Sequence, residues 1–368
     1  MRIPLLCGGG RGRLAAALLA ASCACCAAER MLPAGSEFQC GVNFGFYARE
    51  GYYESAAARA EVDEMVRTGV KWVTVIATVF QETWCSTLQY RDFAESPSDL
   101  ELKEIIDYIH SKGLKVCLRP MEEAQDGTDR CRICFPSDGE RIPGKRVDHA
   151  SRWFDSMRKR SRFYAKIAAK TGCEAYCLDS EINGIMPYND EWRGVIAAVR
   201  EVYKGPVTSC HPFDRAFERW LKDPNCWLRD LDFLSLSDYT SPGTKPGAGV
   251  EAMRKGLGPR RDFLRKMAAA TGMKILFGEV GCTSTAGAAQ CPWGWKGNGG
   301  YDGKEQADFM EAVFSLYENE PWCLGFMWWK WDEQNVRPQF RDDPAGDKGF
   351  TVRGKPAQDV MRRHYRRQ

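Results

Sequence analysis

Residues 175–182 read Ala-Tyr-Cys-Leu-Asp-Ser-Glu-Ile, a short and mostly apolar run with a carboxylate near its end. Runs of this kind are typical of strands in a parallel sheet that helices cover on both faces, because neither face then meets water. A carboxylate on such a strand is costly to bury without a partner. The run therefore predicts a buried parallel strand with a polar site at its carboxyl end.

Seven further runs of similar length and composition are predicted to be strands. They lie at 40–46, 72–79, 115–120, 206–211, 233–239, 275–280 and 324–329. Between the runs, apolar residues recur at the spacing of amphipathic helices, as they do over residues 153–168. Glycines that follow these segments are expected to end the helices: Gly69, Gly113, Gly172 and Gly272.

Eight strands that alternate with helices predict an α/β fold, the (β/α)₈ TIM barrel. A doubly wound sheet is the alternative, but no glycine-rich phosphate turn follows the first strand run. The length of 368 residues fits one barrel with elaborated loops. With 44% apolar and 27% charged residues, the chain can bury a sizeable core. We expect a single domain over residues 29–368.

Residues 1–28 have the features of an export leader. Basic residues precede a short apolar run at 14–21, and small residues and cysteines follow it. The run is shorter than the ~20 apolar residues that a spanning helix needs. Cleavage before Cys23, with lipid on its sulfur, would give a lipoprotein, whereas cleavage after Ala28 would release a secreted protein. We expect a bacterial protein that is exported to the periplasm, cell surface or medium, with a lipid anchor as its only possible membrane contact.

The cysteines and histidines give little support for a metal. Of 16 cysteines, four lie in residues 1–28, and the other 12 would occupy a compartment that permits disulfides. Cys131 and Cys134 form a CxxC motif with no second pair of matching spacing, so loop disulfides or buried thiols are favoured over zinc. Cys282 and Cys291 could staple the loop after the seventh strand run. With four histidines and no HExxH motif, we expect neither metal nor cofactor.

The charge balance argues against a nucleic-acid partner. The 52 Lys and Arg residues against 49 Asp and Glu residues give a net charge of +3, which is too small for a protein that neutralises many phosphates. The 12 tryptophans could stack on sugar rings, although core packing is the alternative. We expect a monomer.

Two carboxylates end strand runs that should face each other across a barrel mouth. Glu181 ends the fourth run, and Glu279 ends the seventh, Ile-Leu-Phe-Gly-Glu-Val at 275–280. Catalytic groups of TIM barrels lie at the carboxyl ends of the strands. Glycoside hydrolysis requires such a pair, one carboxyl to protonate the leaving oxygen and one to attack or to activate water. A structural ion pair is the alternative for either residue.

The chain resembles glycoside hydrolase family 113, a family of retaining β-mannanases in the TIM-barrel clan A. Five blocks in the same order carry much of the resemblance: Gly41-Val-Asn-Phe-Gly-Phe46, Gly113-Leu-Lys-Val-Cys-Leu-Arg-Pro120, Asp179-Ser-Glu-Ile182, Gly278-Glu-Val-Gly281 and Gly325-Phe-Met-Trp-Trp-Lys-Trp331. The resemblance implies Glu181 as acid/base and Glu279 as nucleophile in a double displacement on β-1,4-linked mannose poly- or oligosaccharides. A β-glycosidase acting on glucan or xylan, and a non-catalytic carbohydrate-binding barrel, are the alternatives.

Further polar residues at the strand ends are expected to complete the site. Arg119 and Tyr239 are candidate donors that would keep the nucleophile ionised. The Asn43 amide and the His211 ring are candidate donors to sugar hydroxyls. Ser180 stands where much of the clan has asparagine, which puts the usual contact with the sugar 2-hydroxyl in doubt.

Trp328 and Trp329 are adjacent on the last strand run, so their side chains should point to opposite faces. Only one of them can line the pocket, and we favour Trp329. Glu122 and Glu123 are expected in the loop after the third run, either as added sugar ligands or, the favoured interpretation, as solvated charges.

Overall fold

The computed structural model describes residues 31–368 except 33–36, 47, 137–138, 143, 213–214, 296–298, 332–342 and 344–345. The predicted leader, with its two processing sites at Cys23 and Ala28, lies outside the described residues. Within them, no helix is long and apolar enough to cross a membrane.

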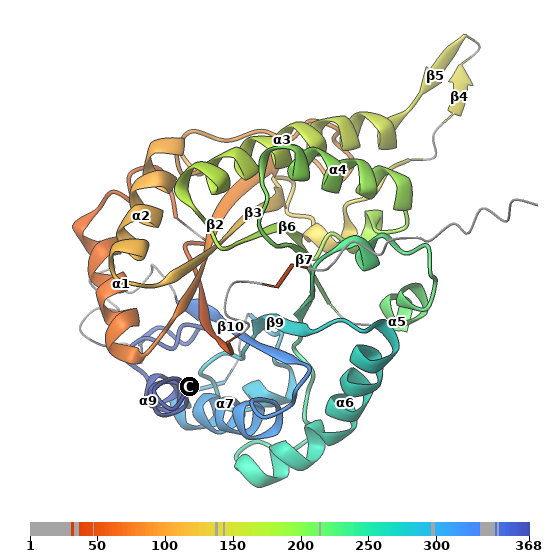
Figure 1. Cartoon of the computed structure of the whole chain (residues 1–368). Helices are drawn as coiled ribbons and strands as arrows, with labels where there is room; N and C mark the ends of the chain where they lie inside the picture. Colours follow the sequence, from red (N-terminus) through yellow and green to blue (C-terminus); the bar gives the residue numbers. More distant parts are fainter. Residues whose placement is uncertain are drawn as a thin grey trace, which may run out of the picture.

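Eight parallel strands close into a barrel in the order β1-β10-β9-β8-β7-β6-β3-β2 (Figure 1). Their bounds are β1 Gln39–Phe44, β2 Trp72–Gln81, β3 Lys115–Ala124, β6 Ala175–Ser180, β7 Val207–Pro212, β8 Leu234–Ser237, β9 Ile275–Val280 and β10 Cys323–Trp331. Each overlaps one of the eight predicted runs, so the predicted TIM barrel is confirmed. Most residues of these strands are buried, because the barrel interior covers one face and the helices cover the other.

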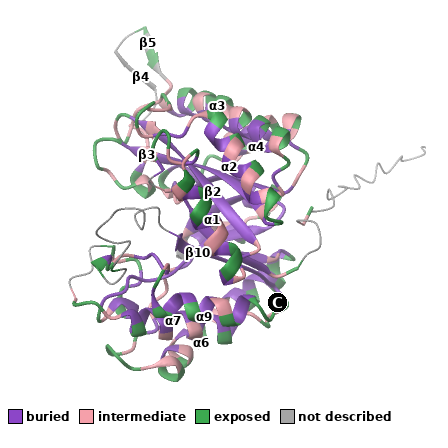
Figure 2. Cartoon of the chain, turned by 90° about the vertical axis from the view of Figure 1, so that its left-hand side faces the viewer, coloured by how far each residue is buried: buried purple, intermediate pink, exposed green. Residues whose placement is uncertain are grey.

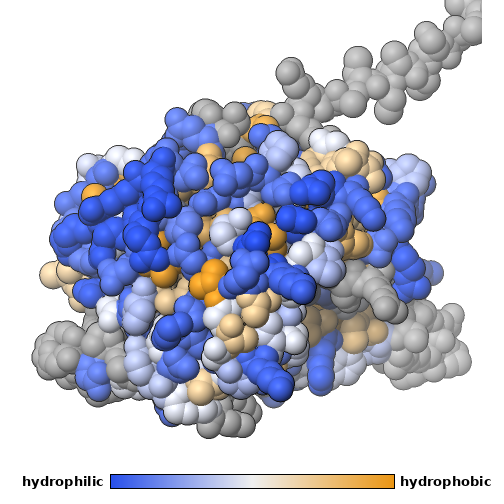
Figure 3. Space-filling model, turned by 90° about the horizontal axis from the view of Figure 1, so that it is seen from below, coloured by the Kyte–Doolittle hydropathy of each residue, from blue (hydrophilic) through white to orange (hydrophobic). Residues whose placement is uncertain are grey.

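Helices form an outer layer around the barrel. Their bounds are α1 Ala56–Thr68, α2 Asp99–Ser111, α3 His149–Thr171, α4 Asn189–Val202, α5 Arg215–Leu221, α6 Val250–Thr271, α7 Gly303–Tyr317 and α9 Pro356–Tyr365. Figure 2 shows their outward faces exposed and the strands buried. The side of the molecule in Figure 3 is hydrophilic over most of its area, as expected for solvent-facing helices.

Local sequence explains where several helices begin and end. Gly69, Gly172 and Gly272 cap α1, α3 and α6 in the left-handed conformation, which glycine adopts without steric cost. At α2 the cap is Lys112, and Gly113 follows with φ 77°. The four glycines therefore lie at helix ends as predicted.

The barrel interior is packed at its amino end. One buried cluster there contains Trp72, Cys117, Ala175, Cys177, Cys210, Phe233, Leu276, Leu324 and Met327. A second small cluster of Ile76, Met121, Trp329 and Phe350 lies against Phe46 and Tyr239. The polar groups of the site occupy the space that these apolar clusters leave at the carboxyl ends of the strands.

One element was not predicted. A two-stranded antiparallel hairpin, β4 Gly139–Ile142 and β5 Lys145–Val147, lies between β3 and α3 and projects from the barrel (Figure 1). Its short strands lack the apolar runs from which the other strands were predicted.

Candidate active site

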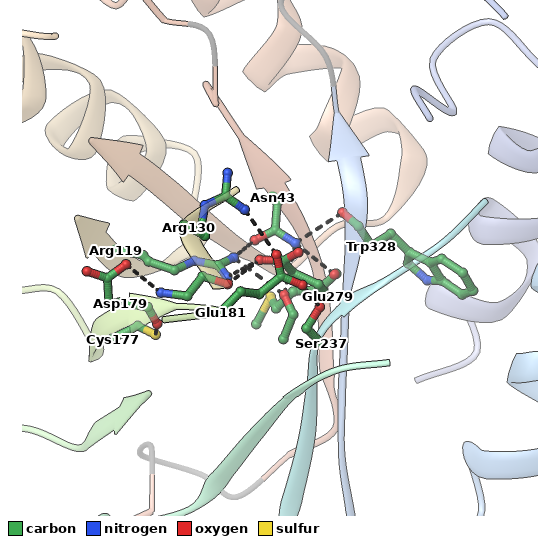
Figure 4. Close-up of polar contacts among 12 residues, drawn as sticks. Asn43, Arg119, Arg130, Cys177, Asp179, Glu181, Ser237, Glu279 and Trp328 are labelled. Atoms are coloured by element: carbon green, nitrogen blue, oxygen red, sulfur yellow. Dashed lines mark hydrogen bonds and ion pairs between the residues drawn. The ribbon is translucent and has the colours of Figure 1, made fainter. Parts of the chain in front are cut away.

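The carboxyl ends of four strands bring a polar cluster together (Figure 4). Asn43 comes from β1, Arg119 from β3, Ser180 from β6 and Glu279 from β9. Glu181 directly follows β6. The structure thus unites the two glutamates on strands that are far apart in the sequence, and the hydrogen bond from Ser180 Oγ to Glu279 Oε1 (2.6 Å) links their two strands directly.

Glu279 is enclosed by hydrogen-bond donors. Its side chain is 3% exposed. Arg119 Nη1 donates to Oε1 at 2.8 Å, Ser180 Oγ to the same oxygen at 2.6 Å, and Tyr239 Oη to Oε2 at 3.3 Å. Donors of this kind favour the ionised carboxylate and fix its orientation.

Asn43 holds Arg119 in place. Its Nδ2 donates to the carbonyls of Gly278 (3.0 Å) and Met327 (2.8 Å), and its Oδ1 accepts from Arg119 Nη2. Asn43 is fully buried, and both ends of its amide are engaged. The expected contact from Asn43 to a sugar hydroxyl is therefore replaced by a supporting role beneath Arg119.

Gly278 is required by the packing around the glutamate that follows it. A Cβ at this position would lie 2.1 Å from Ser235 Oγ on the adjacent strand β8 and 2.9 Å from Cys210 Sγ on β7, one strand further round the barrel. Contacts this short would displace the strand. The glycine lets β9 approach its neighbours closely enough to place Glu279 among its donors.

Glu181 has a different environment. Its φ is 59°, in the left-handed region that costs a non-glycine residue roughly 1 kcal/mol or more and that often marks functional sites. Ser237 Oγ donates to Oε1 at 2.6 Å and Arg130 Nη1 to Oε2 at 3.0 Å. Arg130 also contacts Glu123, so it is shared between two carboxylates. The Glu181 side chain is 23% exposed.

Burial and charge shift the titration of the groups around Glu279. Burial raises the pKa of Glu279 and the negative charge of Glu181 raises it further, while Arg119 and Ser180 oppose the shift. Burial and the charge of Glu279 hold the pKa of Tyr239 well above its usual value, so the hydroxyl remains a donor. Burial tends to lower the pKa of Arg119, but Glu279 and the neighbouring thiols of Cys210, Cys177 and Cys117 together raise it by more, so the guanidinium stays charged.

The side chains of the adjacent Trp328 and Trp329 point to opposite faces of β10, as the alternation of side chains along a strand requires. Trp329 is 8% exposed and packs against Phe46 with ring centroids 5.2 Å apart, on the same side as Tyr239. Trp328 packs against Phe314 of α7 in the helical layer, and only its carbonyl points to Asn43 (Figure 4). Trp329 is therefore the one that can meet a bound sugar.

His211 is not brought to the site. It lies on the outer face of β7, where its ring meets Trp227 edge-on at 5.9 Å and its Nε2 is 2.8 Å from Ser209 Oγ. Burial lowers its pKa to about 3, so the ring is neutral. Because Cys210 faces the barrel interior, the next residue must face the helices.

The expectation for Glu122 and Glu123 is corrected, because β3 extends to Ala124 and includes both residues. Glu122 is fully buried on the outer face, where Arg160 of α3 bridges it (2.5 Å) and Asp179 (2.6 Å). Glu122 is therefore neither a loop charge nor a sugar ligand. Glu123 contacts Arg130 and through it supports Glu181.

Two residues of the site, Arg130 and Ser237, were not predicted as site residues. Ser237 had a usable signal, because Leu-Ser-Leu-Ser at 234–237 alternates and directs its serines to one face. Arg130 lies in a short 3₁₀ helix after β3, and nothing in the local pattern indicates which way its side chain turns.

The cysteines described, from Cys40 to Cys323, are all free thiols. Cys282 is buried and Cys291 exposed, so the expected staple between them does not form. Cys131 and Cys134 are likewise unpaired. In the described ranges, no group of three or more His, Cys, Asp or Glu residues is arranged to hold a metal ion.

Comparisons with known proteins agree with this geometry. The sequence model of Glycoside Hydrolase Family 113 matches residues 42–355. The structure of the GH113 β-mannanase AaManA from Alicyclobacillus acidocaldarius in complex with ManMIm is similar, with 30% identity, a TM-score of 0.78, and coverage of 90% of this chain and 97% of that chain. A GH113 β-1,4-mannanase shows 29% identity, a TM-score of 0.77, and coverage of 90% and 100%.

More distant structures share the fold. A glycoside hydrolase family 5 mannosidase from Rhizomucor miehei has 11% identity and a TM-score of 0.59, with 92% of this chain and 97% of that chain covered. No curated protein matches the chain. Barrel, paired glutamates and family match together define a glycoside hydrolase. The chain belongs to glycoside hydrolase family 113.

Proposed function

We propose that this enzyme hydrolyses β-1,4-linked mannose poly- or oligosaccharides with retention of anomeric configuration. The mannose specificity is supported by the GH113 β-1,4-mannanases, which are about 30% identical over 90% of this chain. The observation that carries the mechanism is the contrast between two carboxylates, one enclosed by donors and one on a strained backbone at the edge of the cluster.

In the first step, a carboxylate oxygen of Glu279 attacks the anomeric carbon as the bond from that carbon to the glycosidic oxygen breaks. Glu181 transfers its proton to the leaving oxygen, so the aglycone departs as an alcohol. The product is a glycosyl ester on Glu279. In the second step, Glu181 takes a proton from water, the water oxygen attacks the anomeric carbon, and Glu279 leaves as carboxylate.

The groups around each glutamate suit these roles. A nucleophile must be ionised before attack, and Glu279 receives a guanidinium and two hydroxyl donors. A proton donor must reach both the leaving oxygen and water, and the Glu181 side chain is the more exposed of the two. Trp329 supplies an indole surface on which a sugar ring could stack.

Structural ion pairs would explain the two glutamates less well than catalysis does. Both glutamates contact an arginine, but an ion pair alone does not require left-handed backbone at Glu181. A non-catalytic sugar-binding barrel would not need both carboxylates. These observations favour catalysis over either alternative.

The test is a substrate panel. We expect the purified protein to release reducing sugar from β-1,4-mannan and manno-oligosaccharides, with far weaker action on β-glucan and xylan. Proton NMR should show the β-anomer as the first product. An α-anomer as first product would contradict retention, and preferred cleavage of glucan or xylan would contradict the mannose assignment.

We also propose export, which rests on the leader pattern in residues 1–28. Fractionation of cells that express the full chain would test it. A membrane-bound protein that becomes soluble on Cys23→Ala would identify a lipoprotein, and a soluble protein that begins at Glu29 would identify cleavage after Ala28.

A further inference from the structure

The carboxyl end of β3 carries a third carboxylate, Glu123, beside the two proposed catalytic glutamates. Arg119, Met121 and Glu123 alternate along β3 and therefore share its inner face. On that face Arg119 donates to Glu279. The Glu123 side chain is 25% exposed, close to the 23% of Glu181. Glu123 has no part in the two proposed chemical steps, although it lies at the same end of the barrel.

Arg130 links Glu123 to the acid/base. Its Nη1 donates to Glu181 Oε2 at 3.0 Å, and its Nη2 donates to Glu123 Oε1. Its Nε donates to the backbone carbonyl of Glu122 at 3.3 Å, and its guanidinium lies over the Phe46 ring, 5.3 Å from the centroid. Because all three guanidinium nitrogens are engaged, the charge of Arg130 is fixed between the two carboxylates.

A guanidinium next to a general acid creates a chemical conflict. A positive charge at hydrogen-bond distance favours an ionised carboxylate, whereas Glu181 must hold a proton when the glycosidic bond breaks. In the second step the requirement reverses, because Glu181 must then be ionised to take a proton from water. An arginine that had Glu181 as its only partner would suit the second step alone.

The carboxylate of Glu123 offsets the charge of Arg130. When Glu181 is protonated, Arg130 keeps Glu123 as an ionised partner, so the guanidinium is not left in the site without a counter-charge, which would be costly. When Glu181 is ionised, Arg130 can donate to both carboxylates. Burial tends to lower the pKa of the guanidinium, but the charges of Glu123, Glu181 and Glu279 and the hydrogen bond to Glu123 together raise it by more, so it is charged.

Other charges also act on this group. Burial raises the pKa of Glu123, Arg130 opposes the shift, and the negative charges of Asp179 and Glu181 add to it. Further titratable or charged side chains that face the group are Glu279 of β9, Tyr239 after β8, Lys330 of β10 and Cys131 beside Arg130. All of these side chains are retained when Glu123 is replaced, so a changed pH profile reports the loss of the Glu123 charge.

We propose that Glu123 is a positioning residue for the acid/base, which holds Arg130 beside Glu181 and offsets its charge so that Glu181 can carry a proton in the first step and act as a base in the second. This inference rests on the proposed function and assigns the control of proton transfer at the same site.

The experiment measures the pH profile of kcat/KM for mannohexaose in two variants that change the local charge in opposite directions. Glu123→Gln removes a negative charge, which favours ionised Glu181, so the basic limb should move to lower pH by about one pH unit. Arg130→Met removes a positive charge, which favours protonated Glu181, so the basic limb should move to higher pH. A merely structural role would not give shifts of opposite sign.

The leaving group gives a second readout. β-Mannobiosyl fluoride needs no proton on its leaving group, so its hydrolysis by Glu123→Gln should change less than about twofold. For mannohexaose near neutral pH, kcat should fall about three- to tenfold, because less of the enzyme carries the required proton. Glu123→Asp keeps the negative charge and should recover part of the loss.

Glu191→Gln is the matched control, because Glu191 also shares an arginine with a second carboxylate. Arg158 of α3 donates to Glu191 at 2.7 Å and to Asp155 at 2.6 Å in the helical layer, and the Glu191 side chain is 35% exposed. This variant should leave the rates on both substrates and the pH profile unchanged.

The outcomes separate this inference from the proposed function. Shifts of the same sign in the Glu123 and Arg130 variants, an unmoved basic limb in Glu123→Gln, or equal losses on both substrates would overturn the role of Glu123 and leave the glycosidase intact. If circular dichroism shows that Glu123→Gln does not fold, Arg130→Met decides: a basic limb at higher pH supports the inference, and any other result overturns it. A wild-type enzyme that cleaves neither substrate would instead refute the proposed function.

Discussion

Glu279 and Glu181 are both strand-end glutamates in one polar cluster, yet their surroundings differ. The Glu279 side chain is 3% exposed and receives donors from β3, β6 and the segment after β8. The Glu181 side chain is 23% exposed, follows β6 with φ 59°, and shares Arg130 with Glu123. The difference shows how one barrel can give two identical side chains different chemistry. A rigid donor set suits attack at carbon, and a looser, more accessible carboxyl suits proton transfer.

Replacing Glu279 should have the largest effect, because it removes the proposed nucleophile. Glu279→Ala should lower kcat/KM on mannan on the order of 10⁴-fold or more. The control is Glu54→Ala, which changes an exposed glutamate and should leave the rate unchanged. A buried glutamate such as Glu305 would be unsuitable as a control, because its loss would also affect folding. Substantial hydrolysis by the Glu279 variant would contradict its role.

Glu181→Gln should lower kcat on mannan about 10²- to 10⁴-fold, the usual range for loss of a general acid/base. It should also move the acidic limb of the pH profile for β-mannobiosyl fluoride, which needs no proton for its leaving group. The charge of Glu181 raises the pKa of Glu279, so neutralising it lowers that pKa, and the limb should shift to lower pH. A shift to higher pH would contradict the coupling.

Arg119→Met tests the donor set of Glu279. Removing one partner of a buried ion pair should cost about 3–5 kcal/mol of stability, measured by urea unfolding. Arg119 also lowers the pKa of Glu279, so its loss should move the acidic limb to higher pH. Arg261→Met removes a half-buried arginine of α6 that pairs with the exposed Asp262. It is the control, and it should change the free energy of unfolding by less than about 1 kcal/mol.

Ser180→Ala should have the smallest effect of the series. It removes one of three donors to Glu279 and should reduce kcat/KM by about tenfold, as expected for a hydrogen bond to a charged group. Ser180→Thr keeps the hydroxyl and should retain more activity than the alanine variant. Equal activity of the wild type and Ser180→Ala would show that this contact does not support the nucleophile.

The sequence was sufficient to predict the barrel and the position of both glutamates. Apolar runs locate the strands, and the carboxyl ends of barrel strands converge wherever the runs close into a cylinder. Strand alternation also separated Trp328 from Trp329. These features depend on local pattern and on general barrel geometry.

Other parts of the site depend on contacts that no local pattern encodes. His211 is the last residue of a predicted strand run, but the register of β7 turns it toward Trp227. From the sequence alone Glu122 is interpreted as a loop charge, because its ion-pair partner Arg160 lies on a helix that is distant in the sequence. Arg130 reaches Glu181 from a 3₁₀ helix whose direction depends on the surrounding loops. Sequence reasoning fails where side-chain direction is decided by tertiary packing.

Azide rescue tests the division of roles between the two glutamates most directly. Azide should restore activity to Glu181→Ala by attacking the glycosyl ester on Glu279, and the product should be the β-mannosyl azide. In Glu279→Ala, azide should instead attack the activated fluoride substrate directly and give the α-mannosyl azide. NMR of the two products would show which anomer of the mannosyl azide each variant forms. The reverse pairing of variant and anomer would contradict the assignment of Glu279 as nucleophile and Glu181 as acid/base.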